Sequence, residues 1–161
     1  MNSQEQMDIR NIEVACAVVF RRIDINMKKY YGRCPNNGGS CFLQANIVKE
    51  ILEENMGYKP ELIFGYASDH DETYIRHFWL ECNGIILDPS TLSLSHKPNR
   101  KLSKTPFNGE CFTSNEFQTS QQISFDMAKN GYFWKDMENN CGIEQVQKYK
   151  IIKHKLKVMY A

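Results

Sequence analysis

The dipeptide Asn83-Gly84, set between two runs of strand-forming residues, constrains the fold more than any other feature of the chain. Asn-Gly favours a type I′ turn, in which both central residues need positive φ, so it predicts a two-residue β-hairpin. One strand is predicted over residues 73–82 (TYIRHFWLEC) and the next over residues 85–88 (IILD). A further strand is predicted over residues 61–67 (ELIFGYA), followed by a polar turn at 69–72. The middle of the chain is therefore expected to form an antiparallel sheet.

A two-residue loop also fixes which residues of the hairpin face each other. The predicted partners are Cys82 with Ile85, Glu81 with Ile86, Leu80 with Leu87 and Trp79 with Asp88. Side chains alternate between the faces of a sheet, so one face is wholly apolar and is expected to meet the core. That face carries Phe78, Leu80, Cys82, Ile85 and Leu87. On the opposite face His77 and Asp88 are diagonal neighbours, about 7–8 Å apart at the backbone and within side-chain reach.

The first third of the chain has the apolar spacing of helices. Apolar residues recur at three- and four-residue intervals over about residues 6–31, and the stretch GRCPNNGG (32–39) then interrupts the pattern. A second helix is predicted to begin at Ser40, a residue favoured as an N-cap. It is predicted to end near Gly57, since glycine is typical of the position after a helix C-terminus.

The patterns are weaker beyond Pro89. Residues 90–121 are rich in Ser, Thr, Asn and Lys and predict long loops, while residues 125–139 predict a short helix. The final stretch YKIIKHKLKVMY (149–160) alternates as an edge strand does. Helices followed by strands indicate an α+β fold. We therefore expect a single domain over 1–161, with a helical part at about 1–57 and a sheet part at about 58–161.

The charge of the chain excludes some classes of partner. The 20 basic and 19 acidic side chains give a formal net charge of +1, which provides no electrostatic basis for binding nucleic acid or a membrane. No signal peptide is recognised, so the six cysteines are expected to be reduced thiols in the cytoplasm; export by another route is the alternative. The Cys and His residues lack the close paired spacing of zinc sites. Neither a metal nor a cofactor is predicted.

Cys41 lies where a loop gives way to the second predicted helix. Free N–H groups and partial positive charge at a helix N-terminus favour a thiolate and can hold an oxyanion. His77 beside Asp88 would supply a base and a group that orients it. A structural interpretation stays open, because free cysteines are often buried and an Asp before Pro often only starts a turn.

Three motifs, GGSC (38–41), HFWLE (77–81) and LDP (87–89), together resemble the transglutaminase-like cysteine superfamily over about residues 35–90. The resemblance implies a papain-like fold, in which a helix carrying the nucleophile packs on an antiparallel sheet carrying His and Asp. It also implies a catalytic triad of Cys41, His77 and Asp88. The stretch GGSCFLQAN is similar, too, to the arylamine N-acetyltransferases, which share the triad but are much longer.

The implied activity is acyl transfer from an amide of a protein or peptide substrate, through a thioester on the cysteine. Water would give peptide or amide hydrolysis or glutamine deamidation, and an amine would give cross-linking. The candidates for a second oxyanion donor, beside the Cys41 N–H, are Asn36, Asn37 and Gln44. Trp79 is a candidate wall of the substrate channel, with plain packing as the alternative. A non-catalytic domain of the same fold that binds a protein or peptide is the alternative function.

Overall fold

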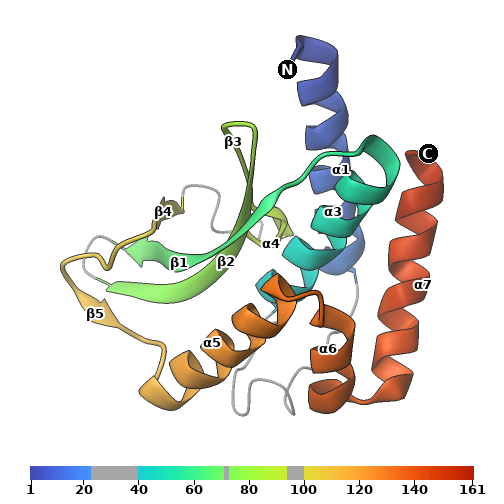
Figure 1. The fold of residues 1–161 in the computed structure, drawn as a ribbon. Helices are drawn as coiled ribbons and strands as arrows, with labels where there is room; N and C mark the ends of the chain where they lie inside the picture. Colours follow the sequence, from blue (N-terminus) through green and yellow to red (C-terminus); the bar gives the residue numbers. More distant parts are fainter. Residues whose placement is uncertain (23–39, 71–72, 94–99) are drawn as a thin grey trace.

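In a computed structural model of the protein, which describes residues 1–22, 40–70, 73–93 and 100–161, helices precede a curled sheet and further helices follow it (Figure 1). The first helix, α1 (Ser3–Arg21), begins where the Asn2 side chain accepts a hydrogen bond of 2.9 Å from the Glu5 N–H. The rest of the predicted first helix, beyond residue 22, and the loop up to residue 39 lie outside the described residues. The fold is therefore α+β, as expected, but the sheet lies between two helical parts of the chain and not at its end.

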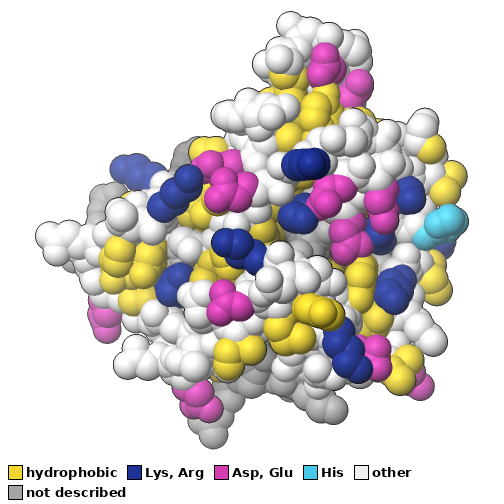
Figure 2. Space-filling view, viewed as in Figure 1, with side chains coloured by type: hydrophobic (Ala, Val, Ile, Leu, Met, Phe, Trp, Pro, Cys, Tyr) yellow, Lys and Arg dark blue, Asp and Glu magenta, His cyan; other side chains and the backbone are white. Residues whose placement is uncertain are grey.

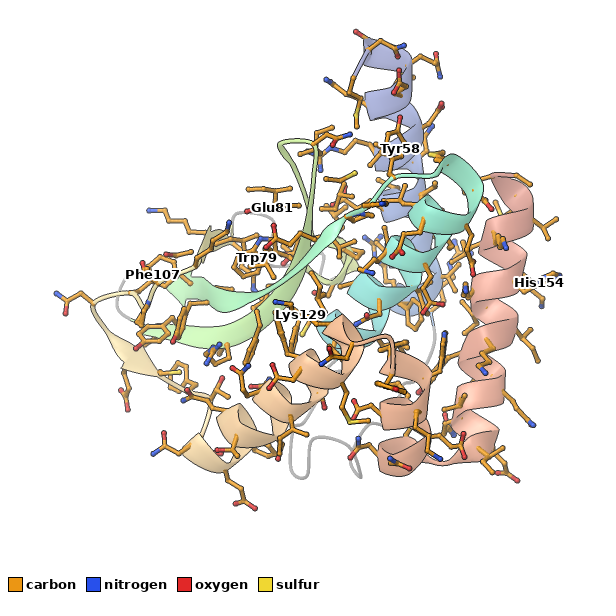
Figure 3. All side chains as sticks on the ribbon, viewed as in Figure 1. Tyr58, Trp79, Glu81, Phe107, Lys129 and His154 are labelled. Atoms are coloured by element: carbon orange, nitrogen blue, oxygen red, sulfur yellow. The ribbon has the colours of Figure 1, made fainter. Side chains whose placement is uncertain are left out.

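The second predicted helix is α3 (Ser40–Met56), and Gly57 follows it with φ of +69°. Ser40 is the first residue of this helix and not its cap. Figure 3 shows Tyr58 between α1 and the end of α3, where its hydroxyl donates a hydrogen bond to Glu5. The C-terminal end of α3 is thereby tied to the first turn of α1.

The predicted hairpin is confirmed in position and register. β2 (Thr73–Cys82) and β3 (Ile85–Leu87) pair antiparallel with the expected partners from Cys82 with Ile85 to Leu80 with Leu87, and both turn residues have positive φ. β3 ends one residue earlier than predicted, because Asp88 already begins the next turn of helix. β1 (Glu61–His70) pairs antiparallel with β2 from Thr73 to Glu81, so a long two-stranded ribbon forms the centre of the sheet.

Two short strands complete the described sheet. β4 (Lys101–Ser103) pairs antiparallel with β1, and β5 (Glu110–Cys111) pairs parallel with the first residues of β2. β5 and β3 lie on the same edge of β2, but β5 meets only Thr73 and Tyr74 and β3 begins to pair at Leu80. Among the described strands, none pairs with this edge of β2 between those points. That stretch of the edge receives the N-terminus of α3.

The C-terminal part of the chain differs from the prediction. The predicted strand over 149–160 is wrong, since this stretch belongs to α7 (Ile143–Met159). The predicted long loops over 90–121 are interrupted by α4 (Pro89–Ser93), by β4 and β5, and by the start of α5 (Asn115–Lys129). The predicted short helix over 125–139 is divided between α5 and α6 (Phe133–Cys141). The sheet therefore ends at Cys111, well short of the expected sheet part at 58–161.

The alternation that suggested a C-terminal strand has a simple physical explanation. Lysines and apolar residues alternate over only part of the stretch, and the pair Ile151-Ile152 breaks the period of two. The residues that α7 buries, Val146, Tyr149 and Leu156, recur at three and seven residues, which is the period of a helix. Lysine is also a good helix former. Packing of this face against the core therefore decides the structure.

The core runs continuously from α1 and α3 through β2 to α6 and α7. α1, α3 and α7 contact one another at one end of the sheet, α5 lies beneath the sheet, and α6 lies between α5 and α7 (Figure 1). The predicted core face of the hairpin is largely buried, as expected, but His77 and Trp79 of the opposite face are buried as well. None of the described helices is long and apolar enough to span a membrane.

Candidate active site

Cys41 is the second residue of α3 and is 9% exposed. Its sulfur hydrogen-bonds with the His77 side chain and with the backbone N–H of Phe78. N–H groups alternate between the two edges of a strand. Because the N–H of Cys82 points to β3, that of Phe78 points to the same edge, where no described strand pairs with it. The first turn of α3 therefore contacts β2 through a backbone donor that the sheet leaves available.

His77 and Asp88 are hydrogen-bonded, in the juxtaposition that the hairpin register predicts. His77 Nε2 lies 2.9 Å from Asp88 Oδ1 and 3.0 Å from Oδ2, and both side chains are buried. An imidazole has two nitrogens, so the bond from Nε2 to the carboxylate leaves Nδ1 for the Cys41 sulfur. Cys41, His77 and Asp88 thus form one continuous chain of hydrogen bonds.

Asp88 also begins α4. Pro89 follows at the first helical position, where proline is favoured, and the Leu92 N–H donates to the Asp88 carbonyl at 3.4 Å. The carboxylate accepts hydrogen bonds from Ser90 Oγ (3.2 Å), the Thr91 N–H (3.3 Å) and Thr91 Oγ1 (2.6 Å). Asp88 therefore fits both interpretations: it starts a helical turn before Pro89, and it is a partner of His77.

The polar contacts of Asp88 determine its charge state. Burial alone would raise the pKa of the Asp88 carboxyl, but His77 and Thr91 outweigh burial and hold this pKa below its ordinary value. The carboxylate is consequently ionised at neutral pH. An ionised carboxylate fixes the orientation of the imidazole and stabilises its cationic form.

The pKa values of Cys41 and His77 are shifted in opposite directions. Burial would raise the pKa of the Cys41 thiol, but hydrogen bonding and charge from His77 outweigh it and lower this pKa. Burial would lower the pKa of His77, but Asp88 and then Cys41 raise it to about 9. The opposed shifts favour a thiolate beside an imidazolium at neutral pH, which is the activated form of a cysteine nucleophile.

Trp79 lies behind His77 and not in an open channel. It is 2% exposed, and its ring stacks on the imidazole with centroids 6.2 Å apart. The indole packs on Gly65 of β1, where a Cβ atom would lie 2.4 Å from Trp79 Cη2 and 2.6 Å from the Ser103 carbonyl oxygen. Figure 3 shows Trp79 over the central ribbon of the sheet. This position favours the packing interpretation of Trp79.

The predicted oxyanion donors fall in two groups. Gln44 is buried in the first turns of α3, where its Nε2 donates to Ser40 Oγ at 3.2 Å. Asn36 and Asn37 lie outside the described residues. The structure therefore places Gln44 on the same helix as Cys41, and the role of all three residues stays a prediction.

Three residues of the site were missed by the sequence reasoning. Ser90 and Thr91 lie two and three residues after Asp88, and treating Asp88 as the N-cap of a short helix would have pointed to them as partners of its carboxylate. Glu13 reaches the site from α1, where its Oε2 accepts a hydrogen bond of 2.6 Å from the Asp88 N–H. Glu13 lies on the same face of α1 as the apolar residues Ile9, Cys16 and Phe20. A carboxylate is rarely buried without a partner, so this position was the signal that Glu13 bonds to another part of the chain.

No group of three or more His, Cys, Asp or Glu side chains in the described part of the chain is arranged to hold a metal ion. The predictions on metal and cofactor stay predictions. No protein-family model matches the chain, and comparison with curated proteins and with solved structures finds no significant match. The assignment of function consequently depends on the geometry of the site and on the motifs of the sequence.

Proposed function

We propose that the protein is a cysteine-dependent acyl-transfer enzyme that acts on amide or peptide bonds. Cys41 is the nucleophile, His77 the general base and acid, and Asp88 the residue that orients His77. The observation that carries this proposal is the continuous hydrogen-bonded chain from the Cys41 sulfur through His77 to Asp88 at a helix N-terminus. A nucleophile, a base and an orienting group in this relation are the signature of covalent catalysis.

The arrangement of the elements supports a papain-like fold of the transglutaminase-like type. The nucleophile is on α3, the helix packs against the strand that carries His77, and Asp88 follows the next strand of the hairpin. The order of Cys, His and Asp along the chain and their distribution between helix and sheet are those that the sequence resemblance implies.

The reaction would proceed in two steps. The Cys41 thiolate attacks the carbonyl carbon of the substrate amide, a C–S bond forms, and the first N–H groups of α3 can stabilise the oxyanion. The C–N bond then breaks as the His77 imidazolium gives its proton to the leaving amine or ammonia. In the second step His77 takes a proton from water or from an acceptor amine, which attacks the thioester and releases Cys41. The products are a carboxylic acid or a new amide.

We place this activity in the cytoplasm, on a protein or peptide substrate. In the described part of the chain no disulfide joins the cysteines, which are Cys16, Cys41, Cys82, Cys111 and Cys141, and this is compatible with the reducing compartment that we propose. A thiolate nucleophile is also maintained only where it is not oxidised.

The second candidate function is a non-catalytic domain that binds a protein or peptide. The low exposure of the site favours it, because Cys41 is 9% exposed and His77 is buried. In that case the hydrogen-bonded chain would be a buried polar network that specifies the packing of α3 on the sheet. Chemical reactivity separates the two functions, since a packing network does not require an accessible thiolate.

The test is the pH dependence of Cys41 alkylation by iodoacetamide, followed by peptide mass spectrometry in the wild type and in His77→Ala. We expect Cys41 to react at pH values well below the free-thiol pKa of about 8.5, and to lose this reactivity in the variant. The half-buried Cys111 is an internal reference in both proteins. If Cys41 reacts no faster than Cys111, or is inert in the folded wild type, the acyl-transfer proposal is wrong and the binding function stands.

A further inference from the structure

We infer that Glu13 of α1 is a positioning residue for the triad, because its buried carboxylate holds the backbone of Asp88 in place. The inference rests on the proposed function of Cys41, His77 and Asp88. It assigns a role to α1, which lies outside the helix and hairpin that carry those three residues.

Glu13 and Arg10 of α1 bond to the backbone of the segment that carries Asp88. Glu13 Oε2 accepts a hydrogen bond of 2.6 Å from the Asp88 N–H. Its other oxygen, Oε1, accepts a bond of 3.1 Å from Arg10 Nη1, and the same Arg10 nitrogen donates to the Ile86 carbonyl at 2.7 Å. Two side chains of α1 therefore hold the backbone on both sides of Leu87, where β3 ends.

The Asp88 N–H requires such a partner. β3 ends at Leu87, and the residue that caps a helix has no acceptor for its N–H within that helix. In a capping box, a Glu three residues into the helix accepts this bond. Here that position is Thr91, whose hydroxyl instead donates to the Asp88 carboxylate. Glu13 supplies the missing acceptor from α1, which leaves Thr91 free to orient the carboxylate toward His77.

Burial of Glu13 is costly, and this supports a specific role. The residue is 4% exposed, and burial raises the pKa of its carboxyl, with a further contribution from the nearby charge of Asp88. The hydrogen bonds from the Asp88 N–H and from Arg10 act in the opposite direction. Burial raises the pKa of the neighbouring Cys16 thiol, and the charge of Glu13 raises it further. A carboxylate kept in an apolar helix face next to a second carboxylate is unfavourable without its hydrogen bonds.

Two substitutions at position 13 separate the effect of side-chain length from the effect of charge. Glu13→Asp keeps the charge but withdraws the oxygen from the Asp88 N–H by one methylene. Glu13→Gln loses the charge but keeps an oxygen at the same reach. A positioning role depends on reach. We therefore expect Cys41 alkylation at neutral pH to slow by about tenfold in Glu13→Asp, which is the lower end of the range for residues that orient metal ligands through hydrogen bonds. In Glu13→Gln the rate should stay within about threefold of wild type, below that range. The pH midpoint of alkylation should move toward the free-thiol value in Glu13→Asp only.

The matched control is Arg21→Ala. Arg21 is on α1 as well, and its Nη2 donates to the Leu92 carbonyl at 2.6 Å, so it docks α1 on the far end of α4 without touching Asp88. We expect Arg21→Ala to leave Cys41 alkylation unchanged. Protection of the fully buried Cys16 shows in every variant that the fold is intact, because an unfolded chain exposes all of its thiols.

The outcomes distinguish failure of the inference from failure of the proposed function. If Glu13→Asp reacts as the wild type does while His77→Ala loses reactivity, the inference is overturned and the function stands. Equal slowing in Glu13→Asp and Arg21→Ala, or a slow Glu13→Gln beside a fast Glu13→Asp, also overturns it. A wild-type Cys41 that is not reactive removes the function itself, and the role of Glu13 with it.

Discussion

The protein has two clusters of paired charges, and they differ in their access to water. The triad cluster consists of Glu13, Cys41, His77 and Asp88. The α3–α7 cluster consists of Glu50, Glu54, Lys153 and Lys157. In the first, the side chains of His77 and Asp88 are 2% and 11% exposed. In the second, those of Lys153 and Glu50 are 15% and 24% exposed, and those of Lys157 and Glu54 are 38% and 41% exposed. Figure 2 shows acidic and basic side chains adjoining over this part of the surface.

The distances within the two clusters are similar, so distance alone does not determine what they do. His77 Nε2 lies 2.9 Å from Asp88 Oδ1, and Lys153 Nζ lies 2.6 Å from Glu50 Oε1. Exposed ion pairs contribute about 0–1 kcal/mol, whereas removal of one partner from a buried pair costs about 3–5 kcal/mol. The α3–α7 cluster therefore aligns two helices, while the triad cluster determines which atoms carry protons.

The largest expected effect is that of Asp88→Ala. The substitution leaves His77 buried without its carboxylate and removes the residue that caps α4. We expect the free energy of unfolding to fall by about 3–5 kcal/mol, measured by urea denaturation at neutral pH. Asp88→Asn keeps an oxygen for Thr91 and loses only the charge, so it should cost less. A loss below about 1 kcal/mol in Asp88→Ala would show that the buried pair contributes no more than a surface pair.

The pH dependence of this loss should be a second difference between the clusters. The charge state of Cys41 affects the pKa of His77, so the measurement compares Cys41→Ser with the double variant Cys41→Ser/Asp88→Ala. The pKa of His77 is raised, and its contribution is therefore fully present below the ordinary value of 6.5 and is lost as the pH rises toward about 9. In the Cys41→Ser background the pKa of His77 is raised less, because the Cys41 thiolate that contributes to the shift is absent. The contribution of His77 is then lost at a lower pH. The pKa of Asp88 is lowered, so its contribution is present above the ordinary value of 3.8 and is lost in stronger acid.

We therefore expect the stability difference between these two variants to be largest between about pH 4 and 6.5 and to shrink by on the order of 2 kcal/mol at alkaline pH. Urea denaturation across this range measures it. A difference that is constant from pH 5 to 9 would mean that His77 is not charged in the folded protein. The α3–α7 cluster should show no such slope, because the pKa of Glu54 is lowered and that of Lys153 is raised, which keeps both charged.

The part of the site that could be predicted from the sequence depends on local signals. Asn83-Gly84 determines its own turn and hence the register, and the register brings His77 to Asp88. The start of α3 at Ser40 follows from the loop composition before it, and so the position of Cys41 at a helix N-terminus was also predictable. Each of these inferences involves residues within about a dozen positions of each other.

The part that could not be predicted depends on contacts distant in the sequence. Glu13 bonds to a backbone group 75 residues away, and nothing in the pattern of α1 indicates that this face meets α4. The helical state of 149–160 depends on packing of Tyr149 and Leu156 against the core, which the partial alternation of lysines obscured. Loop-like composition over 90–121 was likewise outweighed by the packing of α5 beneath the sheet.

The smallest expected effect is that of Lys153→Met. Lys153 Nζ lies 2.6 Å from Glu50 Oε1 and 3.0 Å from Glu54 Oε2, and methionine keeps most of the apolar stem of the lysine. We expect a loss of less than about 1 kcal/mol in the free energy of unfolding, and a smaller loss at high salt, because water and ions screen this cluster. Lys49→Met, which removes a pair with Glu53 within α3, is the matched control. A loss in Lys153→Met as large as that in Asp88→Ala, and insensitive to salt, would place both clusters in the same electrostatic environment. Access to water would then not distinguish the triad cluster from the α3–α7 cluster.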